Sequence, residues 1–162
     1  DMGDLALEAI ALQRALAEAK EQRLETAGDR MPLVDADREL ILRVLQNLIS
    51  NARKYCDASR PELRINVRSK AGRVTVDFID NGKGIPKDVM PKIFDPFFTT
   101  KPIGQGTGMG LSISFKIIQE HGGKILVDSE TGVGTVFTIL LPLKPAQEAA
   151  GAIIDEPELV AA

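Results

Sequence analysis

Apolar residues recur at helical spacing in three stretches of the chain, and each stretch predicts an amphipathic helix. The first stretch covers residues 4–23. The second begins after an N-cap at Asp35 or Asp37 and runs to about Tyr55. The third covers residues 111–121 and stops at a Gly-Gly pair, a common signal for the end of a helix.

Alternation of apolar and polar residues marks the strands, most clearly at residues 63–67 and 74–78. Further strands are expected at residues 33–34, 124–128 and 135–141. Because helices and hairpin-like strand pairs are intermixed along the chain, we predict a two-layer α/β sandwich.

Two segments lack any sustained period. Residues 81–110 are rich in Gly, Pro and Lys, and a loop of that length inside a compact domain is usually functional or disordered. Residues 144–162 are rich in Ala, Pro and Glu, which is typical of a linker or tail. We therefore expect one domain over residues 1–143, followed by a tail.

The composition is that of an ordinary globular domain. The chain has 162 residues, of which 44% are hydrophobic, and its net charge of -3 gives no electrostatic basis for binding nucleic acid or an anionic membrane. The single cysteine, Cys56, excludes an internal disulfide and is consistent with a reducing compartment. No apolar run approaches the roughly 20 residues of a membrane span. We expect a cytoplasmic domain without membrane contact, in a parent protein that could be anchored in the inner membrane.

Asp80 is the first residue whose position suggests chemistry. Counting by twos along the strand from Val74 places its carboxylate on the buried face, where an unpaired charge is costly. Gly82 and Gly84 follow and allow a sharp turn or the close approach of a ligand. From these residues alone, a strand that ends in an ordinary turn is the more common interpretation.

The second predicted helix carries a polar border beside its apolar stripe. Asn47, Asn51, Lys54 and Tyr55 fall within roughly 100° of one another in a helical projection. An amide oxygen suits Mg²⁺, and a lysine could meet phosphate oxygens as a point charge. The same border is also typical of a solvated amphipathic helix, and the helix alone does not distinguish the two.

Residues 104–110 are rich in glycine and stand directly before the third predicted helix. Backbone N–H groups at a helix start, with glycines that allow close approach, form an anion site. The segment matches neither the Walker A pattern nor the dinucleotide-binding Gly-x-Gly-x-x-Gly pattern. A flexible lid without a ligand is the alternative.

Three of the six phenylalanines, Phe94, Phe97 and Phe98, cluster in the otherwise polar loop before this glycine segment. Two interpretations are open. They anchor the loop to the core, which is the commoner arrangement, or they form a surface that a partner recognises.

Together these segments resemble the catalytic and ATP-binding domain of sensor histidine kinases, in the wider family shared with gyrase, heat-shock chaperones and MutL. The matching segments, in order, are residues 47–55 (N box), 80–84 (first glycine box), 94–101 (F box), 106–111 (second glycine box), 121–123 and 132–135 (closing segments). Each match is weak alone, but their order and spacing are specific. The resemblance implies a Bergerat-type ATP-binding fold of the α+β class, whose mixed, mostly antiparallel sheet is covered on one face by about three helices.

The resemblance also implies a role for each matched residue. Asp80 would accept a hydrogen bond from the adenine amino group, Asn51 would coordinate Mg²⁺, and Tyr55 would lie against the adenine or ribose. The expected catalytic residues are Asn47, Asn51, Lys54 and Lys101. The expected nucleotide-binding residues are Tyr55, Asp80, Gly82, Gly84, Ile85, Gly106, Thr107, Gly108, Met109, Gly110, Leu111 and Thr135.

One position distinguishes the branches of this family. Gyrase-like ATPases carry a glutamate general base four residues before the Mg²⁺-binding asparagine, and here that position is Asn47. An amide does not take a proton from water near neutral pH, so the resemblance favours a kinase over an ATPase. His121, the single histidine, belongs to a helix end, where a cation is favoured, and we expect a structural role for it.

The expected function is therefore that of a protein histidine kinase in a two-component system. The domain would bind ATP and Mg²⁺ and donate the γ-phosphoryl group to a histidine on the separate dimerisation domain of the parent kinase. A response regulator would be an indirect partner, and nucleic acid would not be a partner. The alternatives are a nucleotide-binding pseudokinase or docking module, a gyrase-type ATPase, a parent that only dephosphorylates its response regulator, and a serine-directed kinase of the anti-sigma type.

Overall fold

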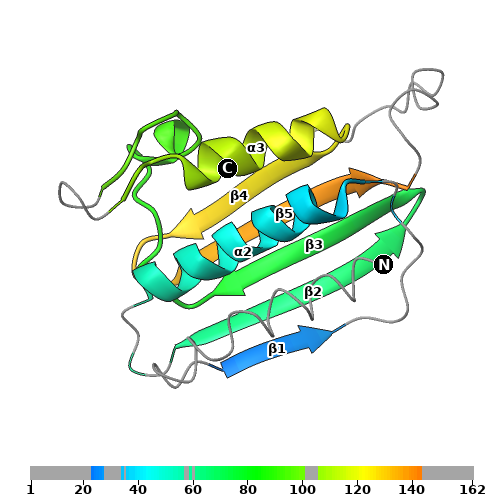
Figure 1. The fold of residues 1–162 in the computed structure, drawn as a ribbon. Helices are drawn as coiled ribbons and strands as arrows, with labels where there is room; N and C mark the ends of the chain where they lie inside the picture. The colour runs from blue at the N-terminus through cyan, green and yellow to red at the C-terminus, as the bar shows by residue number, and fades with distance from the viewer. Residues whose placement is uncertain are drawn as a thin grey trace.

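The computed structural model describes residues 23–27, 34, 36–56, 59, 61–100 and 106–143. Over these residues, two α-helices pack on one face of a five-stranded sheet, which confirms the predicted two-layer sandwich (Figure 1). The elements are β1 (Arg23–Ala27), α2 (Arg38–Tyr55), β2 (Glu62–Lys70), β3 (Arg73–Asp80), the 3₁₀ helix η1 (Met90–Lys92), α3 (Gly110–Glu120), β4 (Lys124–Glu130) and β5 (Gly134–Pro142).

The sheet has the strand order β1-β2-β3-β5-β4. β1 pairs in parallel with β2, and the other neighbours are antiparallel, which confirms a mixed and mostly antiparallel sheet. The last strand, β5, inserts between β3 and β4 and sets Asp80 opposite Thr135. Two residues 55 positions apart in sequence are thereby brought together at one end of the sheet.

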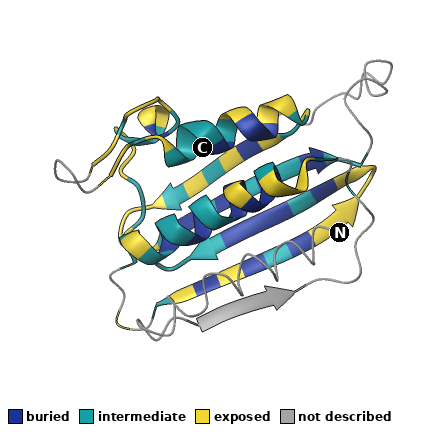
Figure 2. Ribbon diagram, viewed as in Figure 1, coloured by how far each residue is buried: buried dark blue, intermediate teal, exposed yellow. Residues whose placement is uncertain are grey.

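The core lies between the helices and the inner face of the sheet (Figure 2). α2 contributes seven buried residues at helical spacing: Ile41, Leu42, Val44, Leu45, Leu48, Ile49 and Ala52. They face a layer of strand residues that alternate along β2, β3 and β5, and that layer comprises Leu63, Ile65, Val67, Val74, Val76, Phe78, Phe137, Ile139 and Leu141. Burial of this apolar surface drives the pairing of the two layers.

Asp37, one of the two predicted caps, begins α2. Its Oδ1 accepts the Leu40 N–H at 3.0 Å and satisfies a backbone donor of the first helical turn. The Asp37 N–H in turn donates to His121 Nε2 at 3.0 Å, and His121 Nδ1 lies 2.7 Å from the Ile117 carbonyl. Both ring nitrogens of His121 are thus engaged by the backbone, which fits the structural role expected for this residue. It connects the end of α3 to the start of α2.

The structure differs from the sequence prediction mainly near the N-terminus. β1 was not predicted, because its residues show no clear alternation and its pairing with β2 comes only from tertiary contacts. Val34 lies outside any strand and packs against the core. The predicted helix at 4–23, apart from Arg23 in β1, and the tail at 144–162 lie outside the described residues. Within the described part of the chain, no helix is long and apolar enough to span a bilayer.

Replacement of Asp37 by alanine removes the acceptor for the Leu40 N–H and should lower the free energy of unfolding by about 1 kcal/mol. Asp37→Asn keeps an acceptor oxygen and serves as the control. Urea denaturation followed by circular dichroism measures both variants. Equal stability of Asp37→Ala and the unmodified protein would contradict the assigned cap.

Candidate functional site

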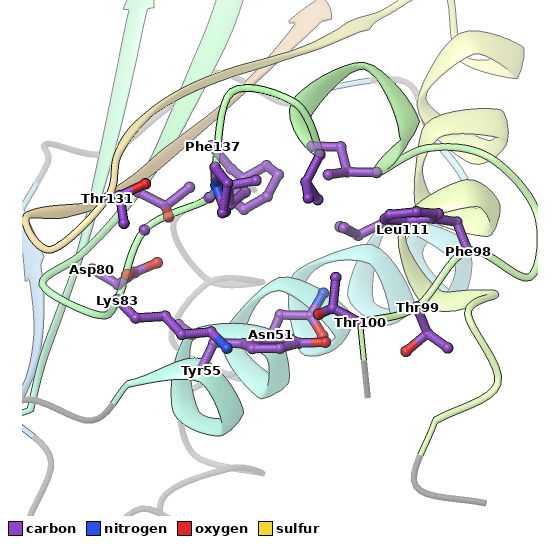
Figure 3. A pocket seen from close by; sticks show the side chains of 17 residues that line it. Asn51, Tyr55, Asp80, Lys83, Phe98, Thr99, Thr100, Leu111, Thr131 and Phe137 are labelled. Carbon is purple, nitrogen blue, oxygen red and sulfur yellow. The ribbon is translucent and has the colours of Figure 1, made fainter. Parts of the chain in front are cut away.

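A cavity of about 300 Å³ opens between α2, the ends of β3 and β5, and the loop that follows β3 (Figure 3). Its lining residues are Asn51, Ala52, Tyr55, Asp80, Lys83, Gly84, Ile85, Pro86, Val89, Ile93, Phe98, Thr99, Thr100, Leu111, Thr131, Thr135 and Phe137. Most of the wall is apolar, and the few polar groups converge from helix, strand and loop. A pocket of this kind suits a flat apolar ligand with a small number of polar contacts.

Asp80 stands at the inner, strand side of this cavity. Its Oδ1 accepts the Gly82 N–H at 2.9 Å, so the turn after β3 is fixed by the carboxylate itself. Burial raises the pKa of the Asp80 carboxyl above its ordinary value of 3.8, and hydrogen bonds from the Gly82 and Thr135 backbone partly offset that rise. The carboxylate therefore has a fixed position, and a further hydrogen-bond donor from a ligand would stabilise its charged form.

The turn between β4 and β5 supports the segment that follows Asp80. Ser129 Oγ accepts the Ile85 N–H at 2.8 Å and donates to the Gly134 carbonyl at 2.8 Å. Gly84 has a φ of 71°, and a Cβ at this position would collide with the Glu130 carbonyl. Glycine is thus required at 84 for both backbone conformation and close approach.

Helix α2 supplies the polar rim of the cavity. Asn51 and Tyr55 both line it, as their spacing of four residues predicts for one helix face. The Lys83 ammonium lies 5.0 Å from the centre of the Tyr55 ring, within the range of a cation–π interaction. Figure 3 shows Lys83, Tyr55 and Asn51 grouped along one side of the cavity. A cation and an amide are therefore available to an anionic part of a ligand.

The three phenylalanines of the loop have different environments. Phe94 packs on Phe115 of α3 with ring centroids 5.0 Å apart, and Phe98 lines the cavity. Phe97 is 73% exposed and has a φ of 67°, which is unusual for a residue other than glycine. Gly108 packs so closely on the Phe97 backbone that no side chain would fit there. Phe94 thus anchors the loop to the core, Phe98 forms part of the cavity wall, and Phe97 faces solvent.

The structure brings together some of the residues singled out from the sequence and not others. Those that line the cavity are Asn51, Tyr55, Asp80, Gly84, Ile85, Leu111 and Thr135. Lys54 is exposed and outside the lining, Gly82 is buried behind Asp80, and the Asn47 amide faces α3. The residues from Gly106 to Gly110 lead into α3 and do not line the cavity. Lys101 lies outside the described residues.

Several lining residues were not predicted. Lys83 lies inside the matched glycine motif, but its contact with Tyr55 depends on how the turn folds. Phe137 shares the inward phase of Thr135 on β5, and that alternation could have identified it. Thr131 and Val89 reach the cavity only through the packing of their loops, and no local sequence signal marks them.

The Asn51 amide on the cavity wall is one group that could hold a divalent cation. Within the described residues, no group of three His, Cys, Asp or Glu side chains could hold a metal ion. The Asn51 amide oxygen fits the preference of Mg²⁺ for few protein oxygens together with water and phosphate. The amide would therefore fit Mg²⁺ whose other ligands are water and phosphate oxygens.

Comparisons with known proteins agree with this geometry. A family model described as histidine kinase-, DNA gyrase B-, and HSP90-like ATPase matches residues 36–145. The signal transduction histidine-protein kinase AtoS of Escherichia coli (strain K12) is 38% identical over 137 residues, which are 84% of this chain and 22% of AtoS. The chain spans less than a third of the length of the curated relatives it matches.

Solved structures resemble the chain over most of its length. The nucleotide-free catalytic domain of histidine kinase ThkA superposes with a TM-score of 0.78 and 36% identity, over 89% of this chain and 93% of that domain. Full-length ShkA in complex with AMPPNP superposes with a TM-score of 0.78 and 27% identity, over 88% of this chain and 30% of ShkA.

The raised pKa of Asp80 predicts a specific pH dependence of stability. Because the folded pKa lies above the unfolded value, the folded state loses stability as the pH rises from 3.8 through the folded pKa. The Asp80→Asn variant lacks this titration but keeps the other carboxylates. We therefore expect the melting temperature of the unmodified protein, minus that of the variant, to fall across this window and then to stay constant. Calorimetry of both proteins without ligand measures it, and a flat difference would contradict the assignment.

Proposed function

The chain belongs to the family of histidine kinase-, DNA gyrase B- and HSP90-like ATPases, and from this membership we propose that it is the catalytic and ATP-binding domain of a sensor histidine kinase. It binds Mg-ATP and donates the γ-phosphoryl group to a histidine on a separate dimerisation domain. The observation that carries the proposal is the half-buried Asp80 carboxylate in an apolar cavity, opposite Thr135.

The cavity accounts for adenine binding. Ile85, Leu111 and Phe137 provide apolar walls for a flat ring. The Gly82 N–H already holds Asp80 Oδ1, and the remaining lone pairs of the carboxylate can accept a hydrogen bond from the exocyclic amino group of adenine. A guanine ring would place a carbonyl oxygen at that position, where it would face a carboxylate without a proton between them. The site therefore favours ATP over GTP.

The phosphates extend from the cavity toward α2 and the glycine segment. Tyr55 would lie beside the adenine or ribose, and Lys83, next to the Tyr55 ring, and the exposed Lys54 are the cations that would meet the phosphates. The backbone of Gly106 to Gly110, at the start of α3, wraps the phosphates, and Lys101 contacts the γ-phosphate. Asn51 would hold Mg²⁺, which would neutralise phosphate charge when bound. The residues of the chain thus position the γ-phosphate for in-line attack, and catalysis rests on orientation and charge neutralisation.

Transfer to a protein histidine is favoured over hydrolysis by the side chain at position 47. Asn47 has no carboxylate that could remove a proton from water. His121 is held between Asp37 and Ile117, so it is not the acceptor. The acceptor histidine is supplied by the dimerisation domain of the parent, and a response regulator receives the phosphate from it. The domain acts in the cytoplasm as one unit over residues 1–143, with residues 144–162 as its tail.

Isothermal titration with ATP and Mg²⁺ tests nucleotide binding. We expect one saturable site, and we expect Asp80→Asn to weaken it by about 10- to 100-fold, the scale of one lost hydrogen bond to a charged group. Asp128→Asn makes the same change at an exposed position on β4 and should leave the affinity unchanged. Absence of binding by the folded, unmodified chain would leave a docking module without nucleotide as the remaining interpretation.

Incubation of the chain with γ-labelled ATP tests the transfer reaction. The chain alone should not become labelled, and the dimerisation domain of its parent, supplied as a separate polypeptide, should acquire an acid-labile phosphohistidine. We expect Asn51→Ala to slow this transfer by about two orders of magnitude, the scale for removal of one electrostatic group from a preorganised site. Asn66→Ala, on the opposite face of the sheet, is the control. Rapid release of inorganic phosphate without transfer would indicate an ATPase of the gyrase type.

A further inference from the structure

Asn47 joins the two helices that flank the cavity. Its Nδ2 donates to the Gly110 carbonyl at 3.3 Å and to Ser114 Oγ at 3.2 Å. Asn47 lies in the middle of α2, and Gly110 is the first residue of α3. The side chain therefore crosses the interface between the helices and fixes the first turn of α3 against α2.

The hydrogen-bond pattern uses position 47 as a donor. Ser114 is fully buried, and its hydroxyl proton is directed to the Gly110 carbonyl at 2.9 Å. Its lone pairs are thus left to accept from Asn47, and the Gly110 carbonyl is itself an acceptor. An ionised carboxylate at position 47 would have no proton for the Gly110 carbonyl and would repel it, and it could bind Ser114 only if that hydroxyl turned away from Gly110.

This connection controls the distance between two walls of the cavity. Asn51 lies one turn beyond Asn47 on the same face of α2, and Leu111 directly follows Gly110. Both line the cavity (Figure 3). Gly110 is also the last residue of the glycine segment that starts at Gly106. Its hydrogen bond with Asn47 therefore holds the point where that segment enters α3.

We propose that Asn47 is a positioning residue that holds the glycine segment and the first turn of α3 at the distance from Asn51 that the phosphates of ATP require. The inference rests on the proposed function, because it assigns the phosphates to this segment. It also gives a structural reason for the absence of a general base. The amide at position 47 donates hydrogen bonds that connect the two helices. A carboxylate there would break this connection and would not activate water.

The test compares the affinities of the full chain for ATP and for adenosine, both with Mg²⁺, by titration calorimetry. Asn47→Asp preserves the shape of the side chain and removes the donor. Gln46→Glu makes the same change of charge one residue away on α2 and is the matched control. We expect Asn47→Asp to weaken ATP binding by about tenfold, the scale of one or two lost hydrogen bonds, and to change adenosine binding less than about threefold.

A second pair of variants keeps the test valid if Asn47→Asp does not fold. Asn47→Ala and Ser114→Ala should each weaken ATP more than adenosine, and the double variant should lose less than the sum of the two, because both remove the same hydrogen bond. Asn47→Glu should show no gain in steady-state ATP hydrolysis over the unmodified chain.

Three results would overturn the inference. Equal loss of ATP and adenosine affinity would indicate general destabilisation, unchanged ATP affinity would show that the connection has no part in binding, and faster hydrolysis by Asn47→Glu would place position 47 beside the attacking water. Failure of the unmodified chain to bind ATP would instead reject the proposed function, so the two failures are distinguishable.

Discussion

The pairing of β3 with β5 is the constraint on which the rest of the site depends. It sets Asp80 opposite Thr135 at the end of the sheet, where the apolar row of β3 ends in a carboxylate. Burial raises the pKa of this half-buried carboxyl, and the backbone N–H groups of Gly82 and Thr135 offset part of that rise. A different strand order would leave the charge without the Thr135 donor, so the insertion of β5 between β3 and β4 completes the polar end of the cavity.

Around this fixed point, the loops are positioned by close backbone contacts. Gly84 lies against Glu130 at the end of β4, and Gly108 lies against Phe97. Since a side chain at either glycine would push the segments apart, these two positions join loops that are distant in sequence. Phe94 then attaches the loop to α3 through Phe115. Part of the cavity wall is thus formed by loops that rest on the helices and strands forming the rest of it.

Helix α2 serves the core and the site through different faces. Its apolar stripe packs on the sheet, while Asn47 and Asn51, one turn apart, point to different neighbours. Asn51 faces the cavity, and Asn47 faces Gly110 and Ser114 of α3. Two identical side chains on one helix therefore have different environments, and the second helix decides which of them reaches a ligand. The link between His121 and Asp37 holds the same two helices together at their other ends.

The sequence by itself determined the central elements and their order, because helical and alternating periodicities reflect which side of each segment is buried. It also identified Asp80 as a carboxylate on a buried face, and Asn51 and Tyr55 as neighbours on one helix. Only the tertiary structure decided the pairing of β1 and the approach of Lys83 to Tyr55. It also decided that Phe97 is exposed while Phe98 lines the cavity, and that Asn47 contacts α3. Those features depend on which distant segments meet, and contacts between distant segments leave no period in the sequence.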